Sequence, residues 1–270
     1  MKISIVTLSF NQCAYLKNAM DSILDQGYRD LEYIVVDPGS TDRSRELIQS
    51  YGGRISKVIL EPDLGAADGL NKGFAVATGE VYGFLNADDL LMPGSLQKVA
   101  DFFCQHPERE FAMGNGYIID SEGERVRHIR ARNFKLRPIC YHGSDWLQQS
   151  TFFRRELFLR SEGFNIENRT CWDGELFTNM VSLGAAVGYM DEDLAQFRIY
   201  PSSITGSGKF KEQYQKDIDR IFARYQGHSW GSIDDIWRQI YRVKRLLSRA
   251  TYNVRNWMRA NLHKWRNPKN

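Results

Sequence analysis

An apolar segment at residues 81–85 ends in the polar run Asn86-Ala87-Asp88-Asp89. Carboxylates placed directly after a buried strand are costly unless a cation compensates their charge. Mg²⁺ or Mn²⁺ would do so, because such ions are typically held by one or two carboxylates together with substrate phosphates. Asp88 or Asp89 would serve equally well as the N-cap of a helix that begins near Pro93. This run alone therefore leaves a metal site and a helix cap open.

A second polar segment follows the apolar run 31–36. Asp37 ends that run, so its carboxylate is placed to accept a hydrogen bond from a nucleobase or a ribose hydroxyl. A turn followed by a helix cap explains the segment as well, because Ser40, Thr41 and Asp42 are residues that turns and caps favour.

Residues 61–74 place three glycines at helical spacing among polar side chains: Gly65, Gly69 and Gly73, with Asp68, Asn71 and Lys72. Glycine allows the backbone to approach a ligand closely, and the polar side chains would then face a phosphate or a ribose. Tight packing of a helix on a sheet accounts for the glycines equally well.

The alternation of apolar runs predicts the elements that position these residues. Strands are expected at 2–8, 31–36, 55–60 and 81–85, with helices at 12–25, 40–51, 65–77 and 93–105. Strands separated by such helices indicate an α/β fold with a mostly parallel sheet that helices cover on both faces. Ligands bind these sheets at the carboxyl ends of the strands, where Thr7, Ser9, Asp37, Asn86 and Asp88 would lie.

The second half of the chain has a mixed pattern. A hairpin is expected over 111–132 with its turn at 120–123, followed by a helix over 172–183 and a strand over 193–200. After Pro201 the pattern is helical, and residues 232–235 resemble a capping box for a long final helix.

The order and spacing of these segments resemble the family-two glycosyltransferases, which have the Rossmann-like GT-A fold. The matching segments are 7–11, 37–42, 68–73, 79–80 and 84–89. The resemblance covers about residues 1–205 and implies a catalytic domain there, with a nucleotide-sugar half at about 1–110 and an acceptor half at about 111–205. Residues 206–270 would form a helical, basic extension.

The resemblance implies an inverting transfer of a sugar from a nucleotide-diphosphate donor to a hydroxyl acceptor. Asp88 would hold a Mg²⁺ or Mn²⁺ ion that bridges the diphosphate and neutralises charge on the leaving group. The donor site would also be lined by Thr7, Ser9, Asp37, Asp68 and Asn86.

An inverting transfer needs a general base to deprotonate the acceptor hydroxyl. The segment 171–176, Cys-Trp-Asp-Gly-Glu-Leu, resembles the family's acidic motif. Asp173 is the predicted base and Glu175 the alternative. A structural interpretation stays open, because a carboxylate at a helix N-terminus is favoured by ~0.3–1 kcal/mol.

Three positions depart from the family pattern. Pro38 and Asn86 stand where many members carry Asp, and Tyr200 stands where relatives often have His. Asp88 is thereby left as the main anionic metal ligand. The Gln-x-x-Arg-Trp motif of processive synthases does not occur in the sequence, which favours transfer of a single sugar.

Composition bears on the setting of the protein. The four cysteines lack metal or disulfide spacing and are expected to be reduced thiols of a cytoplasmic enzyme. No signal peptide is recognised, and no apolar run approaches the ~20 residues of a spanning helix. From Ile236 onward the chain has ten Lys or Arg and no acidic residue, which leaves 26 basic against 33 acidic residues elsewhere. The body is thus acidic, with a net charge of −7, and the tail is basic.

The basic tail also carries an apolar stripe: Ile236, Ile240, Val243, Leu247, Val254, Met258 and Leu262, with Trp237, Tyr241, Trp257 and Trp265 beside it. This pattern predicts an amphipathic helix on an anionic membrane, here the inner face of the cell membrane. Packing of the stripe on the catalytic domain is the alternative. A nucleic-acid partner is not expected, because the body is acidic.

We therefore expect an enzyme of cell-surface glycan assembly that acts on a polysaccharide or lipid-linked acceptor. A sugar nucleotidyltransferase is one rival, but it would need a glycine-rich, basic phosphate loop that residues 7–11 do not supply. A catalytically inert nucleotide-sugar-binding protein is the other, and it is favoured by Pro38, Asn86 and Tyr200.

Overall fold

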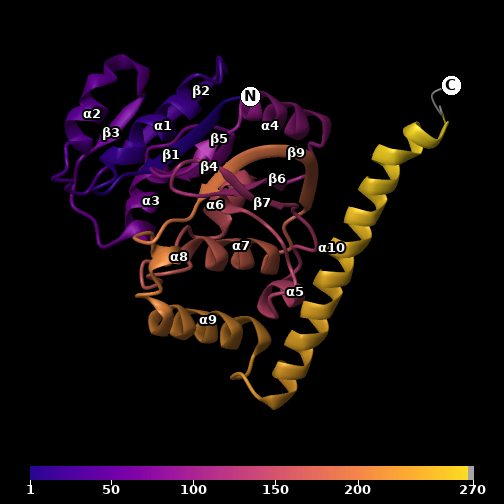
Figure 1. Ribbon diagram of the computed structural model, residues 1–270. Coiled ribbons are helices and arrows are strands. Elements are labelled where there is room, and N and C mark those ends of the chain that lie inside the picture. The colour runs from indigo at the N-terminus through magenta and orange to yellow at the C-terminus, as the bar shows by residue number, and fades with distance from the viewer. Residues whose placement is uncertain (267–270) are drawn as a thin grey trace.

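The computed structural model describes the fold of residues 1–266 and the side-chain surroundings of residues 1–251. Its strands form one mixed sheet in the order β3-β2-β1-β4-β8-β6-β9-β5, with β7 beside β6 (Figure 1). The strands are β1 Ile3–Leu8, β2 Leu31–Val36, β3 Lys57–Ile59, β4 Val81–Asn86, β5 Leu90–Leu91, β6 Phe111–Ile119, β7 Arg125–Ile129, β8 Thr151–Arg154 and β9 Val187–Arg198. The expected α/β fold is confirmed.

The first four strands are parallel to one another, as predicted, whereas β8 is antiparallel to both β4 and β6. The predicted hairpin is confirmed as β6 and β7. The last strand begins at Val187 rather than at 193, because its first residues pair with β6 and extend the sheet. Alternating exposure and burial at residues 187–192 gave little apolar signal for this stretch.

Helices cover the parallel half of the sheet on both faces. On one face, α1 Cys13–Leu24, α2 Ser44–Ser50 and α4 Ser95–Gln105 enclose a core with Ile5 and Val35. On the other face, α3 Ala66–Ala75, α6 Arg155–Arg160 and α7 Trp172–Ser182 pack on Val6 and Val36. A Cβ on Gly73 of α3 would collide with the Val6 side chain, so this glycine serves close packing of helix on sheet.

Two helices begin two to four residues after their predicted starts. Helix α2 begins at Ser44, after Arg43 in the left-handed region at φ 76°, and the preceding Ser40 and Thr41 amides donate to the Asp37 and Asn11 side chains. Helix α4 begins at Ser95, after Gly94 in the left-handed region at φ 75°. Asp88 and Asp89 therefore cap no helix.

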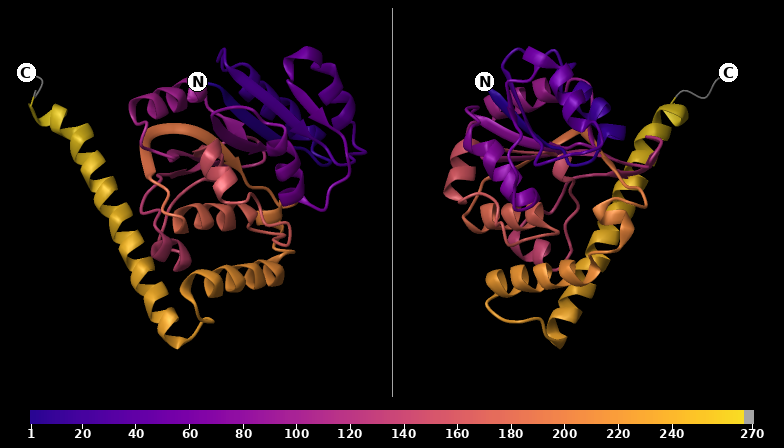
Figure 2. Two further views of the ribbon diagram at one scale, coloured as in Figure 1. Left: turned by 180° about the vertical axis from the view of Figure 1, so that it is seen from behind. Right: turned by 90° about the vertical axis from the view of Figure 1, so that its left-hand side faces the viewer.

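The last helices lie beneath and beside this body. In Figures 1 and 2, α9 Lys211–Gln226 runs below α7, and α10 Ser232–Arg266 rises from its end along one side. The remaining elements are short: the helices α5 Leu136–Cys140 and α8 Ile204–Ser207, and the 3₁₀ turns Gly52–Arg54 and Gln148–Ser150. No helix among residues 1–266 is long and apolar enough to span a membrane.

Helix α10 has one face on the body and one in solvent. Trp237 and Tyr241 join a cluster with Tyr141 of the chain after α5 and Phe222 of α9. The exposed face carries Ile233, Ile236, Val243, Leu246 and Leu247. The alternative that the tail packs on the domain thus applies to one side of the helix, and the predicted stripe residues Ile236, Val243 and Leu247 are exposed on the other. The predicted positions from Val254 to Trp265 lie outside the residues with described side chains.

Candidate active site

A cavity of about 1110 Å³ opens at the carboxyl ends of β1 and β4 and continues to α9 and α10. The parallel register explains its place, because Leu8 of β1 pairs with Val36 on one side and with Asn86 on the other. The residues that follow these strands therefore emerge at one edge of the sheet. Its lining includes four of the predicted site residues: Ser9, Asn86, Asp88 and Asp173.

The adjacent carboxyl groups of Asp88 and Asp89 have different surroundings. Asp89 is fully buried, and its oxygens accept from the Gln149 side chain at 2.7 Å and the Arg198 amide at 2.9 Å. Burial and the neighbouring charge of Asp88 raise the pKa of Asp89 well above its usual range. Asp88 instead lines the cavity. Asp89 thus ties β9 to the end of β4, which leaves Asp88 for a ligand.

Asp88 is held by β9 and by the residues that follow it. The Arg198 Nε donates to the Asp88 carbonyl at 2.9 Å, and the Tyr200 hydroxyl donates to Asp88 Oδ2 at 3.0 Å. Tyr200 is also 3.0 Å from the Gln12 side-chain nitrogen. Burial raises the pKa of Asp88, and the Tyr200 hydrogen bond opposes that rise.

The oxygen ligands available at Asp88 suit a cation that binds together with a phosphate. Asp88 offers a cavity-facing carboxylate, and no other side chain of the described residues donates to its Oδ1. Within that same part of the chain, no three acidic, histidine or cysteine side chains form a complete metal cage. One carboxylate completed by substrate phosphates and water is a common arrangement for Mg²⁺.

Asp173 stands in the first turn of α7 and lines the same cavity. The amide of Gly174 donates to its Oδ1 at 2.7 Å. Burial nonetheless raises the pKa of Asp173 to about 6, more than the helix-terminal amides lower it. A carboxylate with this pKa is deprotonated at neutral pH and is more basic than a solvated Asp.

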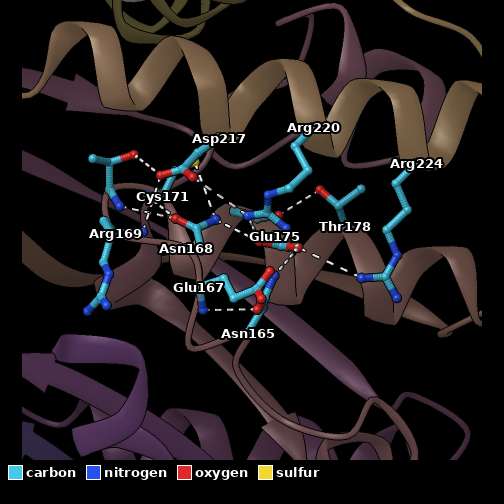
Figure 3. A network of polar contacts seen from close by, with 12 residues as sticks. Asn165, Glu167, Asn168, Arg169, Cys171, Glu175, Thr178, Asp217, Arg220 and Arg224 are labelled. Atoms are coloured by element: carbon cyan, nitrogen blue, oxygen red, sulfur yellow. Dashed lines mark hydrogen bonds and ion pairs between the residues drawn. The ribbon is translucent and has the colours of Figure 1, made fainter. Parts of the chain in front are cut away.

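Glu175, the alternative base, is fixed in a buried network between α7 and α9 (Figure 3). The Arg220 guanidinium binds its two carboxylate oxygens at 2.7 and 2.8 Å. Asn165 and Asn168 donate to the same oxygens at 3.0 and 2.7 Å. Burial would raise the pKa of Glu175, but these contacts hold it below its usual range. Glu175 therefore fastens the start of α7 to α9 and does not line the cavity.

Three residues predicted for the donor site do not line the cavity. Asp37 is fully buried and accepts from Ser40 and from the Arg45 guanidinium at 3.0 Å. The Thr7 hydroxyl accepts from Tyr33 at 3.0 Å. Asp68 accepts from the Leu64 amide at 2.9 Å and pairs with Lys72. In this structure the three side chains order the loops behind the cavity.

Several lining residues were not found by sequence reasoning. Asp63 lines the cavity, and burial raises its pKa. The lining near α9 includes Trp146, Tyr214 and Ile218, and α10 contributes Arg245. Asp63 lies within the polar segment 61–74, so its place in the cavity lining could have been predicted from the sequence. The helix residues carried no signal beyond amphipathic spacing, because their contact with the cavity depends on how α9 and α10 dock.

Comparison with known proteins agrees with this arrangement. The sequence profile described as Glycosyl transferase family 2 matches residues 4–163, which is more than half of the chain. The chain belongs to glycosyl transferase family 2. Its fold is accordingly the GT-A fold of that family.

Individual relatives are distant. An uncharacterised glycosyltransferase of Nostoc is 32% identical over 74% of this chain, and the match spans 65% of the relative's length. Staphylococcus aureus TarS 1–349 superposes with a TM-score of 0.66 at 19% identity, covering 92% of this chain and 72% of TarS. TarS was also solved with UDP-GlcNAc. A Pyrobaculum calidifontis mannosyltransferase, solved with GDP-Man and Mn²⁺, gives 0.64 at 14% identity over 97% and 80% of the two chains.

Proposed function

We propose that this glycosyltransferase is a metal-dependent, inverting hexosyltransferase that moves one sugar from a nucleotide-diphosphate donor to a hydroxyl of a glycan or lipid-linked acceptor. The observation that carries the proposal is that Asp88 and Asp173 line one cavity. One is an oxygen ligand at the end of β4, and the other is a carboxylate with a pKa of about 6.

The donor would lie at the strand-end part of the cavity. Ser9 supports this placement, because the residue lines the cavity and its buried hydroxyl has no hydrogen-bond partner among the described residues. Asn86 and Asp63 line the same end. Thr7, Asp37 and Asp68 would contribute indirectly, by ordering the loops around the nucleoside. The complexes of TarS with UDP-GlcNAc and of the mannosyltransferase with GDP-Man are consistent with a nucleotide-sugar donor.

The transfer itself requires one proton movement. Asp173 takes the proton from the acceptor hydroxyl while that oxygen bonds to the anomeric carbon. The bond from that carbon to the diphosphate breaks on the opposite face, so the configuration inverts. Asp88 and the diphosphate would hold Mg²⁺ or Mn²⁺, which neutralises the negative charge of the departing nucleoside diphosphate.

We also place the protein on the cytoplasmic face of the cell membrane, in cell-surface glycan assembly. The support is the exposed stripe of α10, which faces away from the body while Trp237 and Tyr241 face it. Anionic lipid matches the basic residues that follow Ile236, apart from Arg245, which lines the cavity, and Arg249, which binds Asp145. The apolar stripe and this charge are the two features of a helix that lies in a membrane surface.

A donor-hydrolysis assay tests the enzymatic proposal. Purified protein is incubated with a panel of nucleotide sugars, including UDP-GlcNAc and GDP-mannose, in Mn²⁺ or in EDTA. We expect release of the nucleoside diphosphate from one donor, stimulated by the metal. Production of nucleotide sugar from a sugar 1-phosphate and a nucleoside triphosphate would indicate the nucleotidyltransferase instead. Donor binding without any turnover, in the presence of acceptor mixtures, would indicate an inert binding protein.

A further inference from the structure

Three residues that line the cavity each have a buried polar atom without a partner. Among the described residues, such atoms include Ser9 Oγ, Gln148 Oε1 and Arg245 Nε, and all three residues line the cavity. A buried polar atom that lacks a partner is destabilising, so it indicates a ligand or a water molecule that binds there when the protein functions. Ser9 lies at the donor end. Arg245 comes from α10 and marks a different part of the cavity.

The position of Arg245 is fixed by the preceding turn of α10. Tyr241 packs against Gly143 and stacks on Tyr141, with the ring centroids 5.7 Å apart. This contact holds α10 against the loop that follows α5, and Arg245 follows one turn later on the same side of the helix. His142 of that loop lines the cavity as well. The guanidinium is therefore part of a packed wall.

Asp145, an acid close to Arg245, is already neutralised by other arginines. The Asp145 carboxylate accepts from Arg132 at 2.6 Å and also binds Arg249. Arg245 makes no ion pair with a described residue, and Arg127, Arg242 and Arg249 surround it with further positive charge. Burial lowers the pKa of Arg245, and these arginines lower it further, whereas Asp145 raises it. The site has an excess of positive charge and a free donor.

We propose that this end of the cavity binds a phosphate group of the acceptor through Arg245. The inference rests on the proposed function and names the acceptor class, an anionic one. Guanidinium is well matched to phosphate, because its N–H groups form paired, charge-assisted hydrogen bonds. The same chemistry would serve the phosphate of a lipid carrier or the phosphodiester of a polymer. The apolar lining by Ile139, Ile218 and Ile221 would fit the chain of a lipid carrier.

Binding of small probes tests the proposal without turnover. Ligand-observed NMR is used with hexyl phosphate, glycerol 1-phosphate and the neutral hexyl glucoside, in EDTA so that no metal carries phosphate to Asp88. The chain is compared as wild type, Arg245→Gln and Arg242→Gln. Arg242 is a matched control, because it is an exposed arginine of the same helix that does not line the cavity. Thermal unfolding checks that each variant keeps its fold.

We expect Arg245→Gln to weaken the binding of both phosphates by roughly tenfold or more, as for a lost hydrogen bond to a charged group. The binding of hexyl glucoside should be unchanged. Arg242→Gln should weaken the phosphates less than about twofold. Tighter binding of hexyl phosphate than of glycerol 1-phosphate would identify a lipid-linked phosphate, and equal binding a phosphate polymer. No phosphate binding by the wild type, or equal losses in both variants, would overturn the proposal.

Donor hydrolysis separates this inference from the proposed function. Wild-type hydrolysis of a nucleotide sugar in Mn²⁺ is the readout for the proposed function, because it needs no acceptor. If the wild type hydrolyses no donor while phosphate binding depends on Arg245, the enzymatic proposal fails and the anion site stands. If the donor is hydrolysed but phosphate affinity is the same in the wild type and in Arg245→Gln, only the proposal of the anion site is wrong.

Discussion

The Tyr200 hydroxyl donates to Asp88 Oδ2 at 3.0 Å, across 112 residues of sequence. Tyr200 follows β9, and Asp88 follows β4, so the contact joins the ends of these two strands at the cavity. Burial and the charge of Asp88 raise the pKa of Tyr200 to about 12, and the phenol therefore stays a donor at neutral pH. Tyr200 orients the carboxylate that we assign to the metal, and no side chain of the described residues donates to its other oxygen.

Asp88→Asn should abolish metal-stimulated turnover and weaken donor binding in Mn²⁺, with the fold intact. The reason is that the amide keeps the shape of the side chain and the contact to Tyr200, but loses the charge that a cation requires. Donor hydrolysis and donor-induced thermal stabilisation, each with and without Mn²⁺, measure the effect. Glu61→Gln is the control, since Glu61 is an exposed acid two residues before Asp63 and does not line the cavity. Undiminished, metal-stimulated activity in Asp88→Asn would remove Asp88 from the site.

Asp173→Asn should lower kcat by about 10²–10⁴-fold and leave donor affinity nearly unchanged, as expected for a lost general base. In the wild type, the pKa of about 6 predicts that kcat is constant above this pH and falls tenfold per unit below it. The measurements are the pH profile of transfer at saturating donor and acceptor, and a donor titration of the variant. A fall in donor affinity with a high residual rate would make Asp173 a binding residue instead.

The same substitution should stabilise the protein at alkaline pH. A folded-state pKa above the unfolded value means that the folded chain holds the proton more tightly, so ionisation of Asp173 costs stability as the pH rises from about 4 to 6. Asn carries no charge and escapes this cost. Asp173→Asn should therefore raise the Tm at pH 8, by about 2–4 °C per kcal/mol relieved, and leave it nearly unchanged below pH 4. An equal change in Tm at both pH values would indicate that the effect comes from packing rather than from charge.

Arg220→Met should destabilise the protein by removing the main partner of buried Glu175. Breaking a buried ion pair costs about 3–5 kcal/mol, and the lower end applies here because Arg224 lies 3.8 Å from the same carboxylate. The loss should shrink at acid pH, because hydrogen bonds and ion pairs lower the pKa of Glu175 and its contribution disappears once it is protonated. Urea unfolding at pH 7 and pH 4 measures both effects. Glu175→Met in the same chain should restore part of the loss, and no recovery would mean that Arg220 acts elsewhere.

The sequence was most informative where a residue's position depends on its own strand. Leu31–Val36 and Val81–Asn86 form strands as expected, and Asp88 and Asp173 reach the cavity because each follows or begins an element with a clear apolar pattern. Asp37 also ends its strand, but a fixed strand end does not fix the direction of a side chain. The Arg45 guanidinium and the Ser40 amide draw its carboxylate into the loop.

Contacts made by helix docking could not be predicted in this way. The apolar spacing of α9 and α10 predicts that each is amphipathic, but not which surface receives it. The buried contact of Glu175 with Arg220, and the stack of Tyr241 on Tyr141, depend on pairs separated by 45 and 100 residues. These pairs turn the predicted extension into part of the cavity wall.

The exposed face of α10 should bind anionic vesicles through charge and apolar burial together. Each Lys or Arg near such a surface contributes about 1 kcal/mol, within a Debye length of about 8–10 Å. Half of the ten basic residues would outweigh the weaker repulsion from a body of net −7 held farther away. Insertion of the exposed Ile236, Val243 and Leu247 adds a part that salt does not screen, at up to about 1.5–3 kcal/mol for each fully buried side chain.

The matched change is the triple variant Ile236→Asn, Val243→Asn and Leu247→Asn, since these side chains are exposed and leave the Trp237 and Tyr241 contacts in place. Cosedimentation with vesicles containing phosphatidylserine measures binding at low and high salt. Wild type should bind and release only in part at high salt, whereas the variant should bind weakly and release fully. Donor hydrolysis should be equal in both, because the stripe faces away from the cavity. If the wild type ignores anionic vesicles at low salt, and the triple variant instead turns a dimer into a monomer, then the stripe pairs two copies of this chain.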